Sequence, residues 1–375
     1  MGSRMIKMPW RARNCPNVML EVTDACNIDC QMCYKQKGTI IKSIPQIQRD
    51  IGTAMRIRRL HTMTISGGEP TLHPELCRIV AMIKRRGLHV FLLTNGVLID
   101  EEYLGKLKRS GLDSILFHVD MGQTRPDLPA NPSFSDIQAR LKQLTEMANS
   151  HGLDVSISLT LYDNDQETLN NFSHFFFNSE EITFLFIARG IDPRNLLVQL
   201  TDSHRTSVAV PAASGMTRGI QRLMDYYRVE YGIEPFAFLP TSDGKRTVWI
   251  SYFVPIIYTE TNINPFKIRA NHLDAWLMEI PRIFSGHYIH KTKQNSAVTL
   301  LRVVANGLTT FRLRQLIQFL MQSLSANNKL RHKVIVYDDG PIVENGRLIA
   351  CEDCPTAIVR DDKILRCCTA DYICQ

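Results

Sequence analysis

Residues 21–34 read EVTDACNIDCQMCY and place Cys26, Cys30 and Cys33 in a C-x3-C-x2-C spacing. Three thiols this close together cannot all point into a core, nor can they all pair as disulfides. They suit a cubane iron–sulfur cluster, in which each thiolate binds one iron and the fourth iron stays open. The segment therefore predicts a metal centre near the amino end of the chain.

Two other uses of these cysteines require a different number of ligands. Structural zinc commonly takes four nitrogen or sulfur ligands, and this loop supplies no fourth one. A thioredoxin-like redox pair needs only C-x2-C, which leaves Cys26 without a role. The iron–sulfur interpretation uses all three thiols and is preferred.

A second motif lies in residues 62–70, TMTISGGEP, where a short strand is expected to end in a glycine pair. Glycines let backbone N–H and C=O groups approach a ligand closely. Together the two motifs resemble those of the radical S-adenosylmethionine (radical SAM) superfamily. Its members carry C-x3-C-x2-C after the first barrel strand and G-G-E-P at the end of the second. Here Gly67 follows Cys33 by 34 residues.

The resemblance implies a 4Fe–4S cluster whose open iron is chelated by S-adenosylmethionine, with a low-potential electron donor such as flavodoxin or ferredoxin. Reductive cleavage of the sulfonium would then give a 5′-deoxyadenosyl radical that abstracts hydrogen from a C–H bond. It also implies that the Gly67 and Gly68 backbone and the Glu69 side chain hold the methionine amino group. One departure is Met32, at a usually aromatic position whose backbone meets the adenine, and a flexible thioether should serve there.

Strand and helix patterns alternate from residue 18 to residue 189, which predicts parallel strands with crossover helices. The expected fold is α/β, a partial (β/α)6 TIM-type barrel of the radical SAM kind with a C-terminal α+β cysteine-rich extension. The expected strands are 18–22, 62–66, 89–94, 114–119, 154–161 and 182–188, and the expected helices are 45–60, 74–86, 101–109, 134–150 and 166–176.

Ligands of parallel α/β folds bind at the carboxyl ends of the strands, so further residues at these strand ends are candidates for the active site. Thr94, His118 and Thr160 are candidates by position alone. Each such residue also has a structural interpretation, since Asn-Gly is a common turn pair and an aspartate can cap a loop. The candidate cofactor-binding residues are Met32, Gly67, Gly68, Glu69, Pro70, Asn95, Asp120 and Ser158.

After residue 189 the alternation stops. Residues 190–215 are expected to be a loop, 248–258 a buried strand, and 216–231 and 311–324 amphipathic helices. Their apolar stripes favour core packing over a membrane-binding surface. The expected domains are a radical SAM core at 15–190, a mixed α/β substrate-covering region at 191–345 and a cysteine-rich metal-cluster segment at 346–375.

A second group of cysteines lies in the last 25 residues, and its placement after the core resembles SPASM or twitch extensions. That resemblance favours an auxiliary 4Fe–4S cluster, and geometry alone leaves zinc open. The full seven-cysteine SPASM pattern is absent. The spare thiol, Cys367 or Cys368, is either simply buried or a hydrogen-atom donor that quenches a substrate radical. The candidate ligands are Cys351, Cys354, Cys374 and one of Cys367 or Cys368.

Composition limits the remaining classes. The chain has 375 residues, 44% of them hydrophobic, and a formal net charge of +7. Its basic residues are not interleaved with aromatics in a recognisable module, which argues against nucleic acid. No signal peptide is visible at residues 1–14, and cysteines clustered near both ends indicate metal binding in the cytosol, not disulfides. Contact with a membrane surface is not indicated but stays open.

The leading hypothesis is a radical SAM enzyme, an oxidoreductase acting on a small-molecule or lipid-like substrate. A peptide-modifying enzyme is the alternative, although Cys26 comes too early to leave space for an N-terminal leader-binding domain. A further alternative is a non-catalytic iron–sulfur sensor or a zinc-stapled interaction protein. Neither would have a use for the glycine pair and Glu69.

Overall fold

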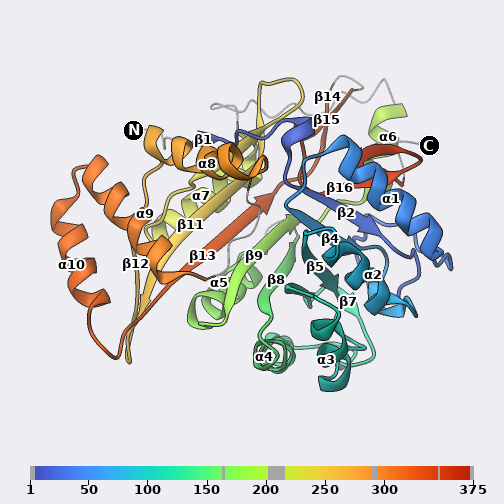
Figure 1. Ribbon diagram of the computed structural model, residues 1–375, viewed down its shortest axis with the longest axis horizontal. Coiled ribbons are helices and arrows are strands. Elements are labelled where there is room, and N and C mark those ends of the chain that lie inside the picture. Colours follow the sequence, from blue (N-terminus) through green and yellow to red (C-terminus); the bar gives the residue numbers. More distant parts are fainter. Residues whose placement is uncertain (1–4, 163–164, 202–215, 289–293, 345–346, 372–375) are drawn as a thin grey trace.

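The computed structural model describes residues 5–162, 165–201, 216–288, 294–344 and 347–371. One large sheet runs through this part of the chain, and helices pack along it (Figure 1). Its strand order is β1-β10-β11-β13-β9-β8-β6-β5-β4-β2-β16-β17, with β12 beside β11. The two ends of this order do not pair among the described residues, so the barrel is partial.

The centre of the sheet confirms the expected barrel. Its six strands are parallel and follow one another in space in chain order, as consecutive β/α units require. They are β2 (Asn17–Glu21), β4 (Thr62–Ser66), β5 (His89–Thr94), β6 (Ser114–His118), β8 (Asp154–Leu161) and β9 (Ile182–Arg189).

The five expected crossover helices are also present. In α4, Ser133 and Asp136 form a capping box that fixes where the helix begins, because each side chain accepts from the other's backbone N–H. The apolar positions Ile137, Leu141 and Leu144 of this helix are fully buried. The helices are α1 (Ile44–Ile57), α2 (Leu76–Lys84), α3 (Glu101–Arg109), α4 (Phe134–Ser150) and α5 (Gln166–Asn178).

The sheet continues beyond β9 into strands from the second half of the chain. Strand β13 (Lys329–Asp338) pairs in parallel with β9 and acts as a seventh barrel strand. The predicted buried strand is confirmed as β11 (Thr247–Tyr258), antiparallel to β13. The edge is completed by β10 (Ala237–Pro240), β1 (Ile6–Lys7) and β12 (Ile263–Pro265).

At the other edge, the cysteine-rich segment adds β16 (Ala357–Arg360) in parallel to β2, and β17 (Lys363–Arg366) pairs with β16. Strands from all three predicted domains thus belong to one sheet, and the domain boundaries stay predictions. Two small sheets lie outside it. They are β14 (Ile342–Glu344) with β15 (Arg347–Ile349), and β3 (Asp29–Cys30) with β7 (Gln123–Thr124).

The prediction of a loop at 190–215 is wrong for its first half, where α6 (Pro193–Thr201) forms. At the start of this helix the Asp192 carboxylate accepts from the Arg194 N–H, and Pro193 at the first helical position has a suitable fixed φ. Residues 202–215 lie outside the described part of the chain.

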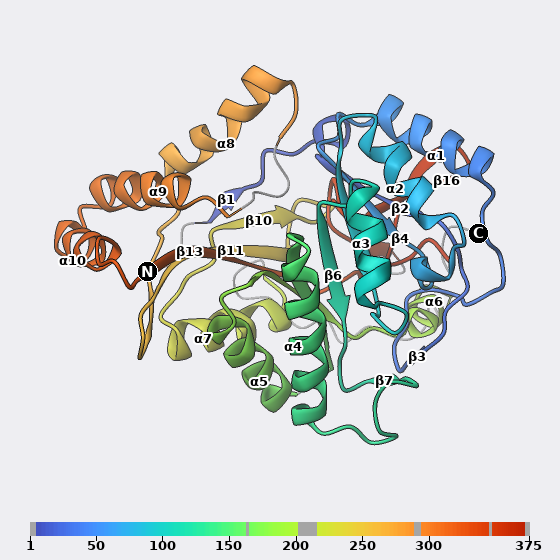
Figure 2. The same ribbon diagram turned by 60° about the horizontal axis from the view of Figure 1, so that its bottom comes forward.

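Of the two predicted amphipathic helices, α7 (Arg218–Glu230) buries its apolar stripe as expected. The expectation for α10 (Leu313–Ser323) is only half right. Leu316 is buried, but Leu313 and Ile317 of the same predicted stripe are exposed. Helices α8 (His272–Ser285), α9 (Ser296–Thr309) and α10 lie together at the end of the molecule away from α1 and α2 (Figures 1 and 2).

Candidate active site

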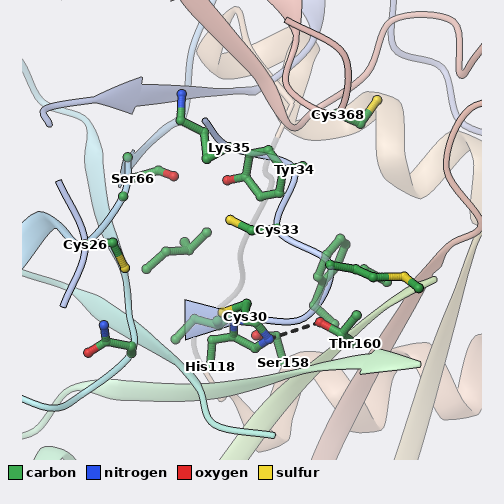
Figure 3. A pocket seen from close by; sticks show the side chains of 18 of the residues that line it. Cys26, Cys30, Cys33, Tyr34, Lys35, Ser66, His118, Ser158, Thr160 and Cys368 are labelled. Carbon is green, nitrogen blue, oxygen red and sulfur yellow. Dashed lines mark hydrogen bonds between the residues drawn. The ribbon is translucent and has the colours of Figure 1, made fainter. Parts of the chain in front are cut away.

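The three cysteines of the first motif line one cavity at the carboxyl ends of the barrel strands (Figure 3). The cavity has a volume of about 260 Å³. The loop that carries the cysteines is closed on itself, because the Thr23 hydroxyl donates to the Ile40 carbonyl at 2.8 Å and the Ile40 N–H donates to the Asp24 carboxylate at 2.6 Å. Cys26, Cys30 and Cys33 are therefore presented from one compact loop.

The glycine pair supports that loop directly. The Gly68 N–H donates to the Thr23 carbonyl at 2.8 Å, and the Glu69 N–H donates to the Ala25 carbonyl at 2.7 Å. A Cβ on Gly68 would lie 2.1 Å from the Ala25 oxygen, and one on Gly67 would lie 2.2 Å from the Thr23 oxygen. Gly67 also has φ near +142°, which side chains rarely adopt. The close approach expected of these glycines is thus made to the backbone of the cysteine loop.

Glu69 joins this turn to the next strand. Its Oε1 accepts from the Thr71 N–H at 3.0 Å and from the hydroxyls of Thr71 and Thr94 at 2.6 and 2.7 Å. Its Oε2 accepts from the Asn95 N–H at 2.7 Å. Burial raises the pKa of Glu69 despite these bonds. Since Oε2 takes one donor and a carboxylate oxygen can take two, one acceptor position remains. The role in holding the methionine amino group stays a prediction.

Asn95 connects the strand rim to the cysteine loop, because its Nδ2 donates to Asn27 Oδ1 at 2.7 Å. Its own Oδ1 accepts from the Val97 N–H at 2.9 Å. This is the kind of hydrogen bond expected in a turn formed by an Asn-Gly pair. Asn95 therefore lines the cavity and also shapes the turn.

His118 and Asp120 form a polar pair beside the cavity. His118 Nε2 lies 2.8 Å from Asp120 Oδ2. It also lies 3.1 Å from the Thr160 hydroxyl (Figure 3). Burial would raise the pKa of Asp120, but the His118 charge and hydrogen bond, together with the N–H groups of Thr160 and Gly122, hold it below its usual range. His118 lines the cavity, whereas Asp120 is buried and is not among its lining residues. Ser158 and Met32 do line it.

The electrostatics of the cysteine loop suit a bound cation. Burial, followed by the charges of Cys33, Asp120 and Cys26, raises the pKa of Cys30 to about 12. Free thiolates are therefore disfavoured here, and bound iron would reverse that preference. In the described residues, no three His, Cys, Asp or Glu side chains are arranged around a single ion. A cubane cluster puts each thiolate on a different iron, so this donor set fits the cluster without converging on one point.

The C-terminal cysteines lie close enough to act electrostatically on one another, but they differ in their hydrogen bonds. The buried thiols of Cys351 and Cys354 share a hydrogen bond, and Cys368 is close enough to act electrostatically on Cys351. The sulfur of Cys367 is instead hydrogen-bonded to the Tyr34 hydroxyl. Of Cys367 and Cys368, only Cys368 lines the cavity. Cys374 lies outside the described residues.

Several cavity residues were missed from the sequence. Arg189 lies at the end of the sixth expected strand, so its position could have nominated it, and its Nε donates to the Asp339 carbonyl at 2.8 Å. Asp338 comes from β13, whose pairing with the barrel no local pattern indicated. Burial raises the pKa of Asp338 to about 6. The missed lining residues include Tyr34, Lys35, Ser66, Arg189, Asp338 and Gly340.

Comparison with known families agrees with the two motifs and the strand order. The sequence profile of the Radical SAM superfamily matches residues 20–175, which contain the cysteine loop, the glycine pair, the end of the first expected barrel strand and the whole of the next four. Residues 20–175 of this chain therefore belong to the Radical SAM superfamily.

Curated relatives match over part of their length. A tungsten-containing aldehyde ferredoxin oxidoreductase cofactor-modifying protein of Pyrococcus furiosus is 32% identical over 108 residues, which is 27% of this chain and 30% of that protein. A probable GTP 3′,8-cyclase of Methanococcus aeolicus is 28% identical over 167 residues, 42% of this chain and 54% of that protein. The chain thus spans about a third to a half of these relatives.

Solved structures show more distant likeness. SuiB of Streptococcus suis bound to the precursor peptide SuiA aligns with 15% identity over 59% of this chain and 47% of that chain, with a TM-score of 0.43. Native anSMEcpe with bound AdoMet aligns with 15% identity over 75% of this chain and 69% of that chain, with a TM-score of 0.40.

Proposed function

We propose that this chain is a radical SAM enzyme that abstracts hydrogen from a small-molecule or lipid-like substrate. The observation that carries the proposal is the joining of the two motifs. The cysteine loop rests on the backbone of Gly68 and Glu69, and both motifs line one cavity at the carboxyl ends of parallel strands. A sensor or a zinc-stapled protein has no need of this cavity.

Cys26, Cys30 and Cys33 would hold the cluster, and Gly67, Gly68, Glu69 and Met32 would contact S-adenosylmethionine. When bound, this pair supplies one-electron cleavage of the sulfonium and the 5′-deoxyadenosyl radical. We expect flavodoxin or ferredoxin as the electron donor. The contribution of the chain is to hold the cysteine loop rigid and to keep the cavity walls apolar at Leu93, Leu116 and Phe186.

The His118–Asp120 pair is the acid–base candidate. The two hydrogen bonds of the His118 ring in the described structure both involve Nε2, which leaves Nδ1 free to accept or donate a proton. The ionised Asp120 carboxylate would stabilise the charged imidazole and fix its orientation. Arg189 and Asp338 add one cation and one carboxyl group at the cavity wall.

A second, auxiliary 4Fe–4S cluster is proposed on Cys351, Cys354, Cys368 and Cys374, with zinc as the alternative. The hydrogen bond that holds Cys367 to Tyr34 supports Cys368 as the ligand. Serine at Cys368 should lower the metal content. Serine at Cys367 should leave it unchanged. If Cys368→Ser instead keeps its metal and loses only product, Cys368 is the hydrogen donor.

The test is anaerobic reconstitution with iron and sulfide, then dithionite and S-adenosylmethionine, with chromatographic detection of 5′-deoxyadenosine and methionine. We expect both products from the wild type and neither from Cys30→Ala. Cys77→Ser is the matched control, since Cys77 is half-buried on α2 and belongs to neither cysteine group. A fully loaded first cluster that gives no 5′-deoxyadenosine would favour the sensor.

A further inference from the structure

Helices α8, α9 and α10 lie at one end of the molecule (Figure 2). They expose many large apolar side chains. Three of them are almost fully exposed: Phe284 (85%), Phe311 (89%) and Leu324 (83%). We define the exposed large apolar residues of the three helices as the apolar face. They are Leu273, Trp276, Ile280, Ile283 and Phe284 from α8, Val298, Leu301 and Leu308 from α9, and Phe311, Leu313, Ile317, Met321 and Leu324 from α10 and its ends.

The apolar face follows the helical period. In α8 the exposed residues 273, 276, 280, 283 and 284 form one stripe, and in α10 residues 313, 317, 321 and 324 form another. On the inner side of α10, Leu316 and Phe319 pack into the core, while Asp274 is the buried residue of α8. Helix α10 thus has one apolar side that packs and a second apolar side that the described residues do not cover.

Side-chain hydrogen bonds join α8 to α9. The Asn271 amide at the start of α8 donates to the Thr309 hydroxyl at 2.9 Å, at the end of α9. Asn306 of α9 donates to the Arg269 carbonyl at 2.7 Å and to Asp274 at 3.3 Å. Because side-chain bonds fix α8 against α9, the exposed stripes keep a defined relation to each other.

Phe311, in the turn between α9 and α10, is held in a strained conformation. Its φ is 55°, in the left-handed region that bulky residues rarely occupy. Its N–H donates to the Leu308 carbonyl, and the Arg312 N–H donates to that of Gly307, so the turn itself is well formed. Glycine or asparagine would satisfy this backbone without strain. The Phe311 ring is nevertheless 89% exposed, so packing within the described residues does not offset this strain.

Basic residues surround this turn. The Arg312 guanidinium donates to the Lys267 carbonyl at 2.7 Å, and burial together with the nearby Arg269 charge lowers the pKa of Arg312. Lys267, Arg269 and Arg314 are exposed, and none of them forms an ion pair within the described residues. We define Lys267, Arg269, Arg312 and Arg314 as the basic corner.

The segment of residues 266–325, which contains the basic corner, is itself strongly basic. Residues 266–325 contain eight Lys and Arg against two Asp and Glu, a balance of +6 in a chain of formal charge +7. Of the two acids, Asp274 is buried, and Glu279 is bonded to Arg282 and Tyr288. The surface therefore offers cations that no acid in the segment neutralises.

We propose that the apolar face and the basic corner dock this protein onto an anionic lipid surface, with Phe311 inserted among the headgroups. Amphipathic helices that expose large apolar residues beside Lys and Arg bind such surfaces in the interfacial plane. No helix of the described chain is long and apolar enough to cross a bilayer. A second copy is a poorer occupant, because self-association would bring two segments of charge +6 together. This proposal does not rest on the proposed catalytic function.

The experiment measures co-sedimentation of the full chain with vesicles of phosphatidylcholine alone or with about a third phosphatidylglycerol. We expect binding to the anionic vesicles that falls steeply with added salt, and little binding to the neutral ones. Phe311→Ser combined with Ile317→Ser should weaken binding about tenfold or more, since each loses the burial of a large apolar side chain. Arg269→Glu combined with Arg314→Glu should weaken it and reduce its salt dependence.

Val229→Ser is the matched control, since Val229 is 77% exposed on α7 and lies outside the apolar face. It should bind vesicles like the wild type. Far-UV circular dichroism and iron content must be unchanged in every variant, which separates lost docking from lost folding. Absence of binding to anionic vesicles would overturn the proposal, and so would equal binding by the Phe311 variant. A dimer in solution that Phe311→Ser dissociates would assign the face to a second copy instead.

Discussion

Lys35 and Asp371, which lie 336 residues apart in the chain, form a buried ion pair with 3.0 Å between Nζ and Oδ2. Lys35 also contacts Glu21 at 2.6 Å, and Arg360 contacts both carboxylates, at 3.0 Å to Glu21 and 2.6 Å to Asp371. Two cations and two anions thus form one ion-pair network, in which each cation contacts both anions. Since Lys35 follows Cys33 by two residues, this network links the cysteine loop to the C-terminal segment.

Asp371→Asn should therefore destabilise the protein and weaken the cysteine loop. The change leaves the two cations with one carboxylate, and breaking a buried pair costs on the order of 3 kcal/mol. We expect that loss in the free energy of unfolding by urea, and less iron bound after reconstitution. The control is Asp362→Asn, because the Asp362 side chain is 79% exposed and its ion pair with Arg56 is long, at 3.6 Å. Equal iron loading by the Asp371 variant and the wild type would contradict the link.

Gly68→Ala tests whether the glycine pair is needed to seat the cysteine loop. The added methyl group would lie 2.1 Å from the Ala25 carbonyl oxygen, so the loop must move away. We expect loss of most reconstituted iron, measured from the visible absorbance of the cluster. Gly52→Ala is the control, because nothing lies within 4 Å of the new methyl group. That helical change should stabilise the protein by about 1 kcal/mol. Full iron loading in Gly68→Ala would show that the contact is not needed.

Glu69→Gln tests the carboxylate that joins the turn to the strand rim. Glu69 accepts four hydrogen bonds, and an amide NH2 would face donors from Thr71 or Asn95 at one end. Leaving such groups unpaired costs about 1–3 kcal/mol. We expect that loss in stability and weaker S-adenosylmethionine binding in calorimetry. Glu75→Gln, at an exposed pair with Arg78, should change neither. Unchanged affinity in the Glu69 variant would remove the residue from the cofactor site.

Local patterns were sufficient for the barrel and for much of the site. The strands at 62–66, 89–94 and 154–161 have the predicted bounds, because each is an apolar run between turn residues. The cysteine spacing and the glycine pair are also local, and cavity lining by Asn95 and Ser158 followed from the rule that ligands bind at strand ends.

Long-range pairing was not available from local patterns. Strand β13 joins β9 after an excursion of about 140 residues, so Asp338 could not be placed in the cavity. The contact of Tyr34 with Cys367 likewise depends on β16 packing beside β2. Periodicity showed that residues 311–324 form an amphipathic helix, but a helix with two apolar sides gives no local sign of which side is covered.

Lys333 of β13 is a buried cation with few compensating charges. It is fully buried, and its ammonium contacts the Ser179 and Ile182 carbonyls and lies 4.8 Å from the centre of the Phe176 ring. Burial lowers the pKa of Lys333 to about 7, against the opposing effect of Glu181 and Glu180. In the unfolded chain the pKa of a lysine is near 10.4. The folded and unfolded states therefore differ in bound protons between these two values.

This difference predicts a pH-dependent stability that Lys333→Met should remove. Between pH 7 and pH 10 the unfolded chain keeps a proton that folded Lys333 has lost, so the free energy of unfolding rises with pH. From pH 7 to pH 9 the wild type should gain about 2 kcal/mol relative to Lys333→Met. Urea unfolding at pH 7, 8 and 9 measures this difference, in which the titration of the cysteines cancels. Lys329→Met, at an exposed pair with Glu180, should run parallel to the wild type. If Lys333→Met also runs parallel, the buried ammonium stays charged in the folded protein, and the carbonyl contacts outweigh its loss of hydration.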